Sequence, residues 1–230
     1  MKYMKIDQFT IELEKKRIKN MYLKVLAPDG RIVVTAPFRM KDEEIKTFIM
    51  SKLSWIEQHQ LKILQKPVRT ELSYVTDEIL TLWGRSYTLY VLEQAKRPKV
   101  TIIGDVLQLS VSKDSTLLQR KAIIDKWYKE KLSEQVPYLI HKWEKLIGVQ
   151  AGAYRIRDMK SRWGSCNIQT HEICINLQLA KRPLRCLEYV VVHELVHLLE
   201  KSHNKIFWGY MDVFMPEWKK IRLELKTNVQ

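Results

Sequence analysis

Apolar and polar residues alternate over much of the first hundred positions, which is the pattern of strands that bury one face. Residues 9–13 show this alternation, and two strand-like runs at 21–27 and 31–37 flank Pro28-Asp29-Gly30. Because Pro, Asp and Gly together favour a tight turn, these two runs predict a β-hairpin. The same reasoning predicts three later strands, at 87–92, 100–103 and 107–111.

Apolar residues spaced three and four positions apart predict helices elsewhere in the chain. One helix is expected over about 42–64, where the acidic first turn Asp42-Glu43-Glu44 suits the helix dipole. A longer helix is expected over about 117–147. The remaining chain predicts strands near 154–157 and 173–177 and helices over 184–199, 205–214 and 217–226.

This order of elements predicts an α+β fold with two domains, because strands dominate early and helices late. Lys113-Asp114-Ser115 has the composition of a boundary. We therefore expect a β-rich N-terminal domain over residues 1–113. A mainly helical domain that contains a small sheet is expected over residues 114–230.

The overall composition is that of a soluble globular protein rather than a disordered one, with 46% apolar and 29% charged residues. The N-terminus is too charged for a secretory signal. The longest apolar stretch, 190–199, contains His193, Glu194 and His197, so neither a membrane span nor a membrane partner is predicted. We therefore expect a cytoplasmic protein.

The net charge of +14 favours partners with negative charge, such as nucleic acid or nucleotides. Lys and Arg are spread along the chain, however, and a solvated basic surface is the competing interpretation. Cys166, Cys174 and Cys186 form no CxxC pair, which excludes a structural zinc ribbon. Reduced and partly buried thiols are expected instead.

The strongest chemical signal is His193-Glu194-Leu195-Val196-His197, an HExxH sequence within a helix that is apolar almost all round. Ionisable groups inside a buried helix are costly unless a partner satisfies them, and a metal ion is such a partner. Histidines four residues apart project from one face of a helix, so His193 and His197 can bind one ion. Glu194 can then reach a water molecule on that ion. We predict one catalytic zinc ion per chain, with Glu194 as the general base.

A catalytic zinc ion needs a third protein ligand. His203 is the preferred candidate, although on a continuing helix it would be turned ~80° from His193 and lie ~15 Å along the axis. The helix must therefore end before His203, and Ser202 or Asn204 suits the N-cap of a following helix. Glu217 is the alternative ligand, whereas Glu200 fits a supporting role better.

Four segments resemble the YgjP-like metallopeptidase family, which is related to the SprT-like zinc metallopeptidases: RIRDMKSRWGSC (155–166), ICINLQL (173–179), VVVHELVHLLEKSH (190–203) and IFW (206–208). APDGRIVVTAP, WIEQ and LWGRSYTL, earlier in the chain, also fit, so the resemblance spans nearly the whole sequence. It implies a zincin-like catalytic domain in which His193, His197 and His203 bind zinc and Glu194 is the catalytic base. The turn at 167–172 departs from the family because it lacks glycine, which leaves the position of His171 open.

Residues near 162–176 are candidates for substrate contact. The strand 173–177 is expected to run along the cleft and pair with an extended substrate. Arg162 is a catalytic candidate because it can stabilise an oxyanion or hold a carboxylate or phosphate, with a structural salt bridge as the alternative. Gly164 is expected to serve a tight turn, and Asn176 to orient a ligand or close the strand end. Trp163 and Trp208 are expected to be packing residues.

Three functional classes remain open from the sequence. A zinc peptidase that acts on a peptide or protein is favoured. The resemblance also implies a nucleotide hydrolase as a candidate, because pyrophosphatase activity on UTP has been attributed to members of the family. The third is a nucleic-acid-associated SprT-like protease or scaffold. Basic residues clustered around the metal cleft would favour nucleotides, whereas a neutral groove beside the strand 173–177 would favour peptides.

Overall fold

The computed structural model describes residues 2–26, 29–64 and 72–227. The chain divides into two compact units, residues 1–70 and 71–230. The boundary expected at residue 113 falls instead inside the second unit, because the strands between 79 and 110 share one hydrophobic core with the helices that follow them. The fold class is confirmed: the chain combines β-sheets in its N-terminal half with a mainly helical C-terminal half.

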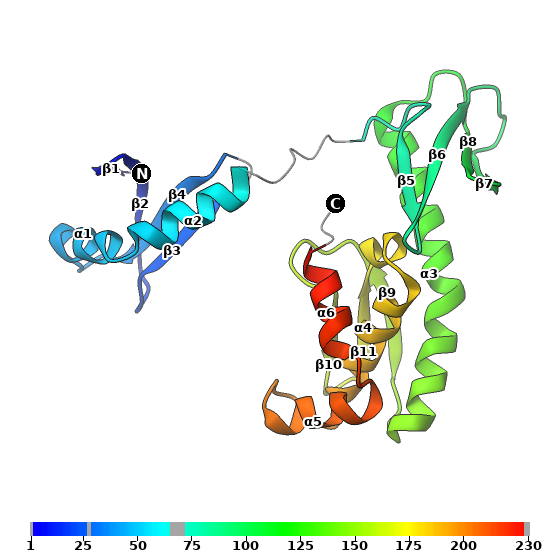
Figure 1. The fold of residues 1–230 in the computed structure, drawn as a ribbon. Coiled ribbons are helices and arrows are strands. Elements are labelled where there is room, and N and C mark those ends of the chain that lie inside the picture. The colour runs from blue at the N-terminus through cyan, green and yellow to red at the C-terminus, as the bar shows by residue number, and fades with distance from the viewer. Residues whose placement is uncertain (1, 27–28, 65–71, 228–230) are drawn as a thin grey trace. The chain divides into compact units, whose positions relative to one another are not determined.

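The first unit is a four-stranded sheet with two helices (Figure 1). Its strands, in the order β1-β2-β4-β3, are β1 (Lys2–Ile6), β2 (Phe9–Lys16), β3 (Tyr22–Leu26) and β4 (Arg31–Pro37). The predicted hairpin is confirmed, since β3 pairs with β4 antiparallel; Pro28 of its expected turn lies outside the described residues. The single helix predicted over 42–64 is two helices, α1 (Asp42–Met50) and α2 (Leu53–Leu64).

The second unit begins with a sheet of the same strand order and strand directions, β5-β6-β8-β7. Its strands are β5 (Ile79–Leu82), β6 (Arg85–Leu92), β7 (Lys99–Ile103) and β8 (Val106–Ser110). Each sheet consists of two antiparallel hairpins. A parallel pairing joins the two hairpins, β2 with β4 in the first sheet and β6 with β8 in the second. The two sheets are therefore similar in topology.

The long helix α3 (Leu117–Ile147) has the predicted bounds and runs through Pro137. Thr116 and Gln119 form a capping box at its start, and Gly148 ends it in the left-handed conformation that glycine adopts without strain. A three-stranded sheet in the order β10-β11-β9 follows, made of β9 (Ala153–Arg157), β10 (Gly164–Asn167) and β11 (Glu172–Asn176). The sheet is succeeded by the 3-10 helix η1 (Leu177–Lys181).

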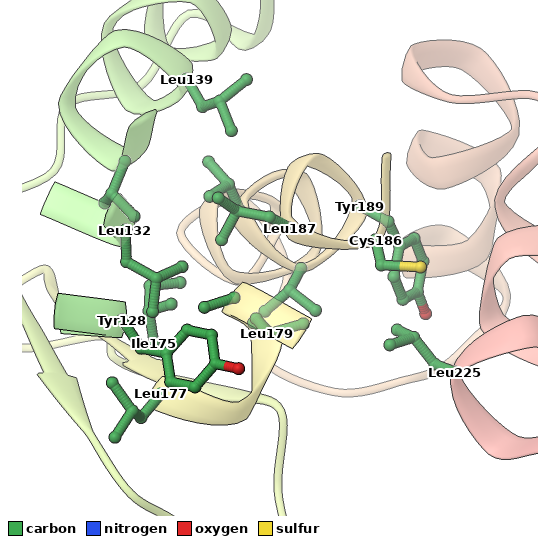
Figure 2. Close-up of a cluster of buried hydrophobic side chains, with 14 of the residues drawn as sticks. Tyr128, Leu132, Leu139, Ile175, Leu177, Leu179, Cys186, Leu187, Tyr189 and Leu225 are labelled. Carbon is green, nitrogen blue, oxygen red and sulfur yellow. The ribbon is translucent and has the colours of Figure 1, made fainter. Parts of the chain in front are cut away.

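The C-terminal part comprises α4 (Leu184–Val196), α5 (Lys205–Phe214) and α6 (Trp218–Thr227). Helix α4 lies between α3 and α6 (Figure 2). Its Leu187 faces Leu132 and Leu139 of α3, while Cys186 and Tyr189 face Leu225 of α6. Burial on these sides explains why α4 is apolar almost all round. Within the described residues, no helix is both long and apolar enough to span a membrane.

Candidate metal centre

The end of α4 brings three histidines together. The helix stops at Val196, three residues earlier than predicted, and His197 is its C-cap. The chain then turns back, and Asn204 begins α5 by accepting hydrogen bonds from the backbone N–H groups of Ile206 and Phe207. The helix therefore ends before His203, as the spacing of the histidines required.

The ring nitrogens of His193, His197 and His203 offer one ligand atom each within 4.8 Å of one another. Nε2 of His193 and Nε2 of His203 lie 2.9 Å apart. A tetrahedral zinc ion with Zn–N bonds of ~2.0–2.1 Å separates its ligand nitrogens by about 3.3 Å, so small movements of the rings would accommodate the ion. The chemistry and the spacing of this donor set fit zinc.

The surroundings keep these histidines neutral, which is the form that binds metal. Burial, followed by the charges of His197 and His203, lowers the pKa of His193 to about 3. Burial also lowers the pKa of His197 and of His203. Nδ1 of His197 lies 3.2 Å from the backbone oxygen of Glu200, which leaves Nε2 directed to the centre. Nδ1 of His193 is buried and has no hydrogen-bond partner among the described residues.

Trp208 holds His203, the exposed member of the three. Its indole N–H donates to the backbone oxygen of His203 at 3.0 Å, and the two rings stack with their centroids 5.5 Å apart. Trp208 in turn stacks on Trp218 at 4.3 Å, and the guanidinium of Arg222 lies over the Trp208 ring. Trp208 was expected to be only a packing residue, but it is half-buried and is in direct contact with a candidate ligand.

Glu194 lies on α4 beside the first histidine and is 4% exposed. Burial raises the pKa of its carboxyl group to about 8, with the charge of Arg162 acting in the opposite direction. The carboxylate packs against Gly164 of β10: a Cβ added there would lie 2.5 Å from Oε1 of Glu194 and 2.7 Å from Cγ1 of Val190. The interpretation of Gly164 as a turn residue was therefore wrong, since it is a strand residue that leaves room for Glu194.

The sheet places β10, not the strand predicted at 173–177, at the edge beside α4. That predicted strand is β11, which pairs with β10 on one side and β9 on the other. Both of its edges are occupied, so it cannot pair with a substrate. Within the described chain β10 pairs only with β11, and its outer edge is open. The sequence did not predict β10 as a strand, because Gly164 and Ser165 are poor strand formers.

Asn176 fixes the loop that carries Arg162. Its side chain is 3% exposed, and its amide group donates to the backbone oxygens of Met159 at 2.7 Å and of Arg162 at 2.6 Å. Its Oδ1 accepts from the backbone N–H of Gln178 at 3.0 Å. Of the two roles considered for Asn176, the structure shows the one at the strand end. Trp163, in the same loop, is half-buried, and the guanidinium of Arg182 lies over its ring.

A hollow of about 710 Å³ lies along β10. Arg162, Ser165 and Cys166 are among the residues that line it. Burial, and to a smaller extent the charge of Glu194, raises the pKa of Cys166 to about 11. Neither Glu194 nor any of the three histidines lines this hollow.

Two of the other candidates lie apart from this group. Glu217 does not belong to the three-histidine cluster, and no second cluster of this kind occurs in the described parts of the chain. His171 occupies the β10–β11 turn with φ of +57°, a conformation usually taken by glycine, and its Nδ1 lies 3.0 Å from the backbone oxygen of Gln150. His171 thus replaces the missing turn glycine and is exposed.

A buried glutamate next to three converging histidines defines the class of metal-dependent hydrolases with an HExxH helix. The sequence pattern of the YgjP-like family, metallopeptidase domain, matches residues 19–228. The chain therefore belongs to the YgjP-like metallopeptidase family, whose members are hydrolases that use a divalent metal ion, typically zinc.

Two solved structures share part of the chain. The metallopeptidase zymogen abylysin of Pyrococcus abyssi is 24% identical, with 41% of this chain and 95% of that chain covered and a TM-score of 0.39. The metallopeptidase zymogen jannalysin of Methanocaldococcus jannaschii is 19% identical, with 41% and 97% covered and a TM-score of 0.37. Among curated proteins, none matches the sequence.

Proposed function

We propose that this protein is a zinc peptidase in which His193, His197 and His203 hold the metal ion and Glu194 is the general base. The observation that carries the proposal is the placement of Glu194: it is buried, it adjoins the three histidines, and Gly164 leaves space for its carboxylate. When bound, a zinc ion supplies Lewis-acid polarisation of a carbonyl group and lowers the pKa of a water molecule to about 7.

The residues of the chain supply the proton transfers. Glu194 accepts a proton from the attacking water on Oε1 or Oε2 and later passes it to the leaving amine. Burial raises the pKa of the Glu194 carboxyl group in the metal-free chain, and a zinc ion held by the neighbouring histidines would lower it again and favour the carboxylate form that acts as the base. Arg162 is positioned by Asn176 and can stabilise negative charge that develops on the substrate.

An extended peptide fits the edge of the catalytic sheet. The backbone of β10 offers unpaired N–H and C=O groups next to α4, and such an edge can bind an additional strand. A substrate held along Gly164–Asn167 would lie beside Glu194, because Gly164 is in contact with that carboxylate. This edge favours a peptide over a nucleoside triphosphate or a purely scaffolding role.

The test is a turnover screen of the zinc-loaded protein against peptides and nucleoside triphosphates including UTP, with Glu194→Gln at matched zinc content as the comparison. Turnover should fall by about 10²–10⁴-fold in the variant, while zinc content and folding are retained. Glu188→Gln is the matched control. Glu188 lies on the same helix, but its carboxylate accepts from Lys142 and the Trp143 indole, so turnover should equal that of the wild type.

Peptide cleavage that is equal in the wild type and in Glu194→Gln would refute the assigned base. Turnover of UTP but of no peptide would refute the peptidase function and support nucleotide hydrolysis at the same site. Absence of turnover on both substrate classes, in protein that carries one zinc ion per chain, would favour a scaffold that associates with nucleic acid.

A further inference from the structure

Positive charge is concentrated in the first unit of the chain. Residues 1–70 contain fifteen Lys and Arg but only eight Asp and Glu. Their net charge of +7 is half of the total of +14, although they make up less than a third of the sequence. Because charge of one sign at this density attracts anionic partners, the place where the unit leaves its cations unpaired is where such a partner would bind.

Two loops of this unit lie side by side at one end of its sheet. One loop, residues 17–21, joins β2 to β3, and the other, residues 38–41, joins β4 to α1. The parallel pairing of β2 with β4 sets Lys16 opposite Pro37. The backbone N–H of Phe38 then donates to the backbone oxygen of Lys16 at 3.2 Å. Side chains from both loops therefore belong to one surface.

Three cations on this surface have no partner. Arg17, Lys19 and Arg39 are exposed, and across the described residues none of the three forms a salt bridge or a side-chain hydrogen bond. The carboxylates that flank the two loops in the sequence are already engaged: Glu14 with Lys16 at 2.8 Å, Asp42 with Lys2 and Lys15 at 2.6 and 2.9 Å, Glu43 with Lys46 at 3.3 Å, and Glu44 with the backbone N–H of Lys41 at 3.0 Å. The unit therefore does not neutralise these three charges itself.

Two aromatic rings lie at the same end of the sheet. Phe38 is 65% exposed, and Tyr22, the first residue of β3, is 52% exposed. Tyr22 pairs with Thr35 near the end of β4, and because its neighbour Leu23 packs against the core, Tyr22 points away from the core. Neither ring is in contact with another ring or with a cation of the described chain. Both rings thus present an open face to a ligand.

We propose that this surface, formed by Arg17, Lys19, Tyr22, Phe38 and Arg39 and here called the basic end, binds single-stranded nucleic acid. The three cations contact phosphates of the strand, and the two rings stack on its unpaired bases. The proposal goes beyond the peptidase function and does not depend on it, because all five residues belong to the first unit and none to the metal centre.

The aromatic rings favour a single strand over other anionic partners. A duplex keeps its bases stacked inside the helix and would use only the cations. An anionic membrane is usually bound by an amphipathic helix that buries a continuous apolar face, whereas the basic end consists of two loops and the start of a strand. Separate rings among unpaired cations are what a strand with alternating phosphates and exposed bases requires.

The second unit offers a matched control. Lys96 and Arg97 lie in the loop between β6 and β7, which has the same place in the second sheet as the loop between β2 and β3 has in the first. Both side chains are exposed, and neither has a partner among the residues that the structure describes. The loop between β8 and α3, residues 111–116, contains no aromatic residue. Lys96→Gln/Arg97→Gln therefore removes two comparable charges where no ring is available for stacking.

The experiment measures binding of the full chain, by fluorescence anisotropy, to fluorescein-labelled oligo(dT), oligo(U) and a DNA duplex of the same length. At least one of the two single strands should bind more tightly than the duplex. Arg17→Gln/Lys19→Gln should weaken this binding about tenfold. It should also reduce the slope of log K against log salt by about 1.4, because each phosphate contact on a single strand contributes about 0.7.

The ring is tested separately from the charges. Phe38→Ala should weaken binding of the single strand about tenfold at an unchanged salt slope, whereas Phe38→Trp should retain it. Lys96→Gln/Arg97→Gln should change the affinity by about twofold or less. All substituted side chains are exposed, so urea unfolding of each variant should agree with that of the wild type.

Three results would overturn the proposal. Equal losses in the two double variants would show that binding follows total charge and not the basic end. Equal affinity for the duplex and the single strands, unaffected by Phe38→Ala, would show purely electrostatic binding to DNA. Failure to bind either single strand would also overturn it, and Phe38-dependent binding to vesicles of phosphatidylserine and phosphatidylcholine would then identify a membrane surface. None of these results depends on peptide turnover, so the peptidase function is tested independently.

Discussion

Replacing Gly164 by alanine should inactivate the protein without removing its metal. A methyl group at this position would lie 2.5 Å from Oε1 and 2.9 Å from Cγ of Glu194, and 2.7 Å from Cγ1 of Val190. Ordinary van der Waals contact begins at 3.4 Å, so Oε1 would have to move away from the added methyl group by about 0.9 Å. Val190 belongs to the buried part of α4 and its clash is not relieved by rotation of Glu194, so β10 must shift away from α4 while the carboxylate of Glu194 is displaced.

The magnitude follows from this displacement. A shift of about 1 Å in a catalytic group costs about 10²-fold in rate, which sets the expected fall in kcat for Gly164→Ala. Crowding of a packed site costs about 1–3 kcal/mol, so the free energy of unfolding should decrease by that amount. The three atoms nearest to the added methyl group belong to Glu194 and Val190 and not to a histidine, so zinc affinity should be unchanged.

Gly209→Ala is the control for this experiment. Gly209 lies inside α5, and a Cβ there would meet no atom within 4 Å. The substitution should leave turnover unchanged and stabilise the fold by about 0.5–1 kcal/mol, since alanine is the better helix former. The assays are peptide turnover, zinc content by mass spectrometry of the metal, and urea unfolding followed by tryptophan fluorescence. Wild-type turnover in a folded, zinc-loaded Gly164→Ala protein would show that Glu194 is not the base.

Two further predictions concern the metal and the thiols. His203→Ala should weaken zinc binding by at least 10²-fold in competition with a coloured chelator, whereas Glu217→Ala should not; the reverse result would make Glu217 the ligand. Burial raises the pKa of Cys166 to about 11, so its thiol stays protonated at neutral pH. Alkylation by iodoacetamide, followed by peptide mass spectrometry, should therefore be slow at pH 7.5 and accelerate above pH 10; reaction at pH 7.5 at the rate of a free cysteine would contradict this environment.

Local signals explain what the sequence predicted well. The bounds of α3 agree with the prediction because a capping box at Thr116 and a glycine at 148 mark its two ends within a few residues of chain. The turn between α4 and α5 was also predictable. Three histidines can meet only if the helix ends before His203, and Asn204 is a strong N-cap.

Contacts between distant residues explain what the sequence did not predict. The turn at 113–115 resembles a domain boundary, yet Leu107 and Leu109 before it share a core with Ile124 and Tyr128 after it. A boundary depends on which apolar faces meet, and a turn signal carries no information about that. Gly164 was misinterpreted for the same reason, because its neighbour Glu194 is thirty residues away in the sequence and comes close only through the packing of β10 on α4.

One long-range pairing decides both which strand beside α4 has an open edge and where Arg162 lies. The sequence places a turn at 167–172 between β10 and β11. It does not predict which of these two strands pairs with β9. Because β9 pairs with β11 in parallel, the chain must cross from the end of β9 back to the start of β10, and that crossing is the loop that carries Arg162. The same pairing leaves β10 at the edge beside Glu194 and places Arg157 at the hollow. Pairing of β9 with β10 instead would have closed this edge, so the open edge of β10 and the loop that carries Arg162 have a common structural origin.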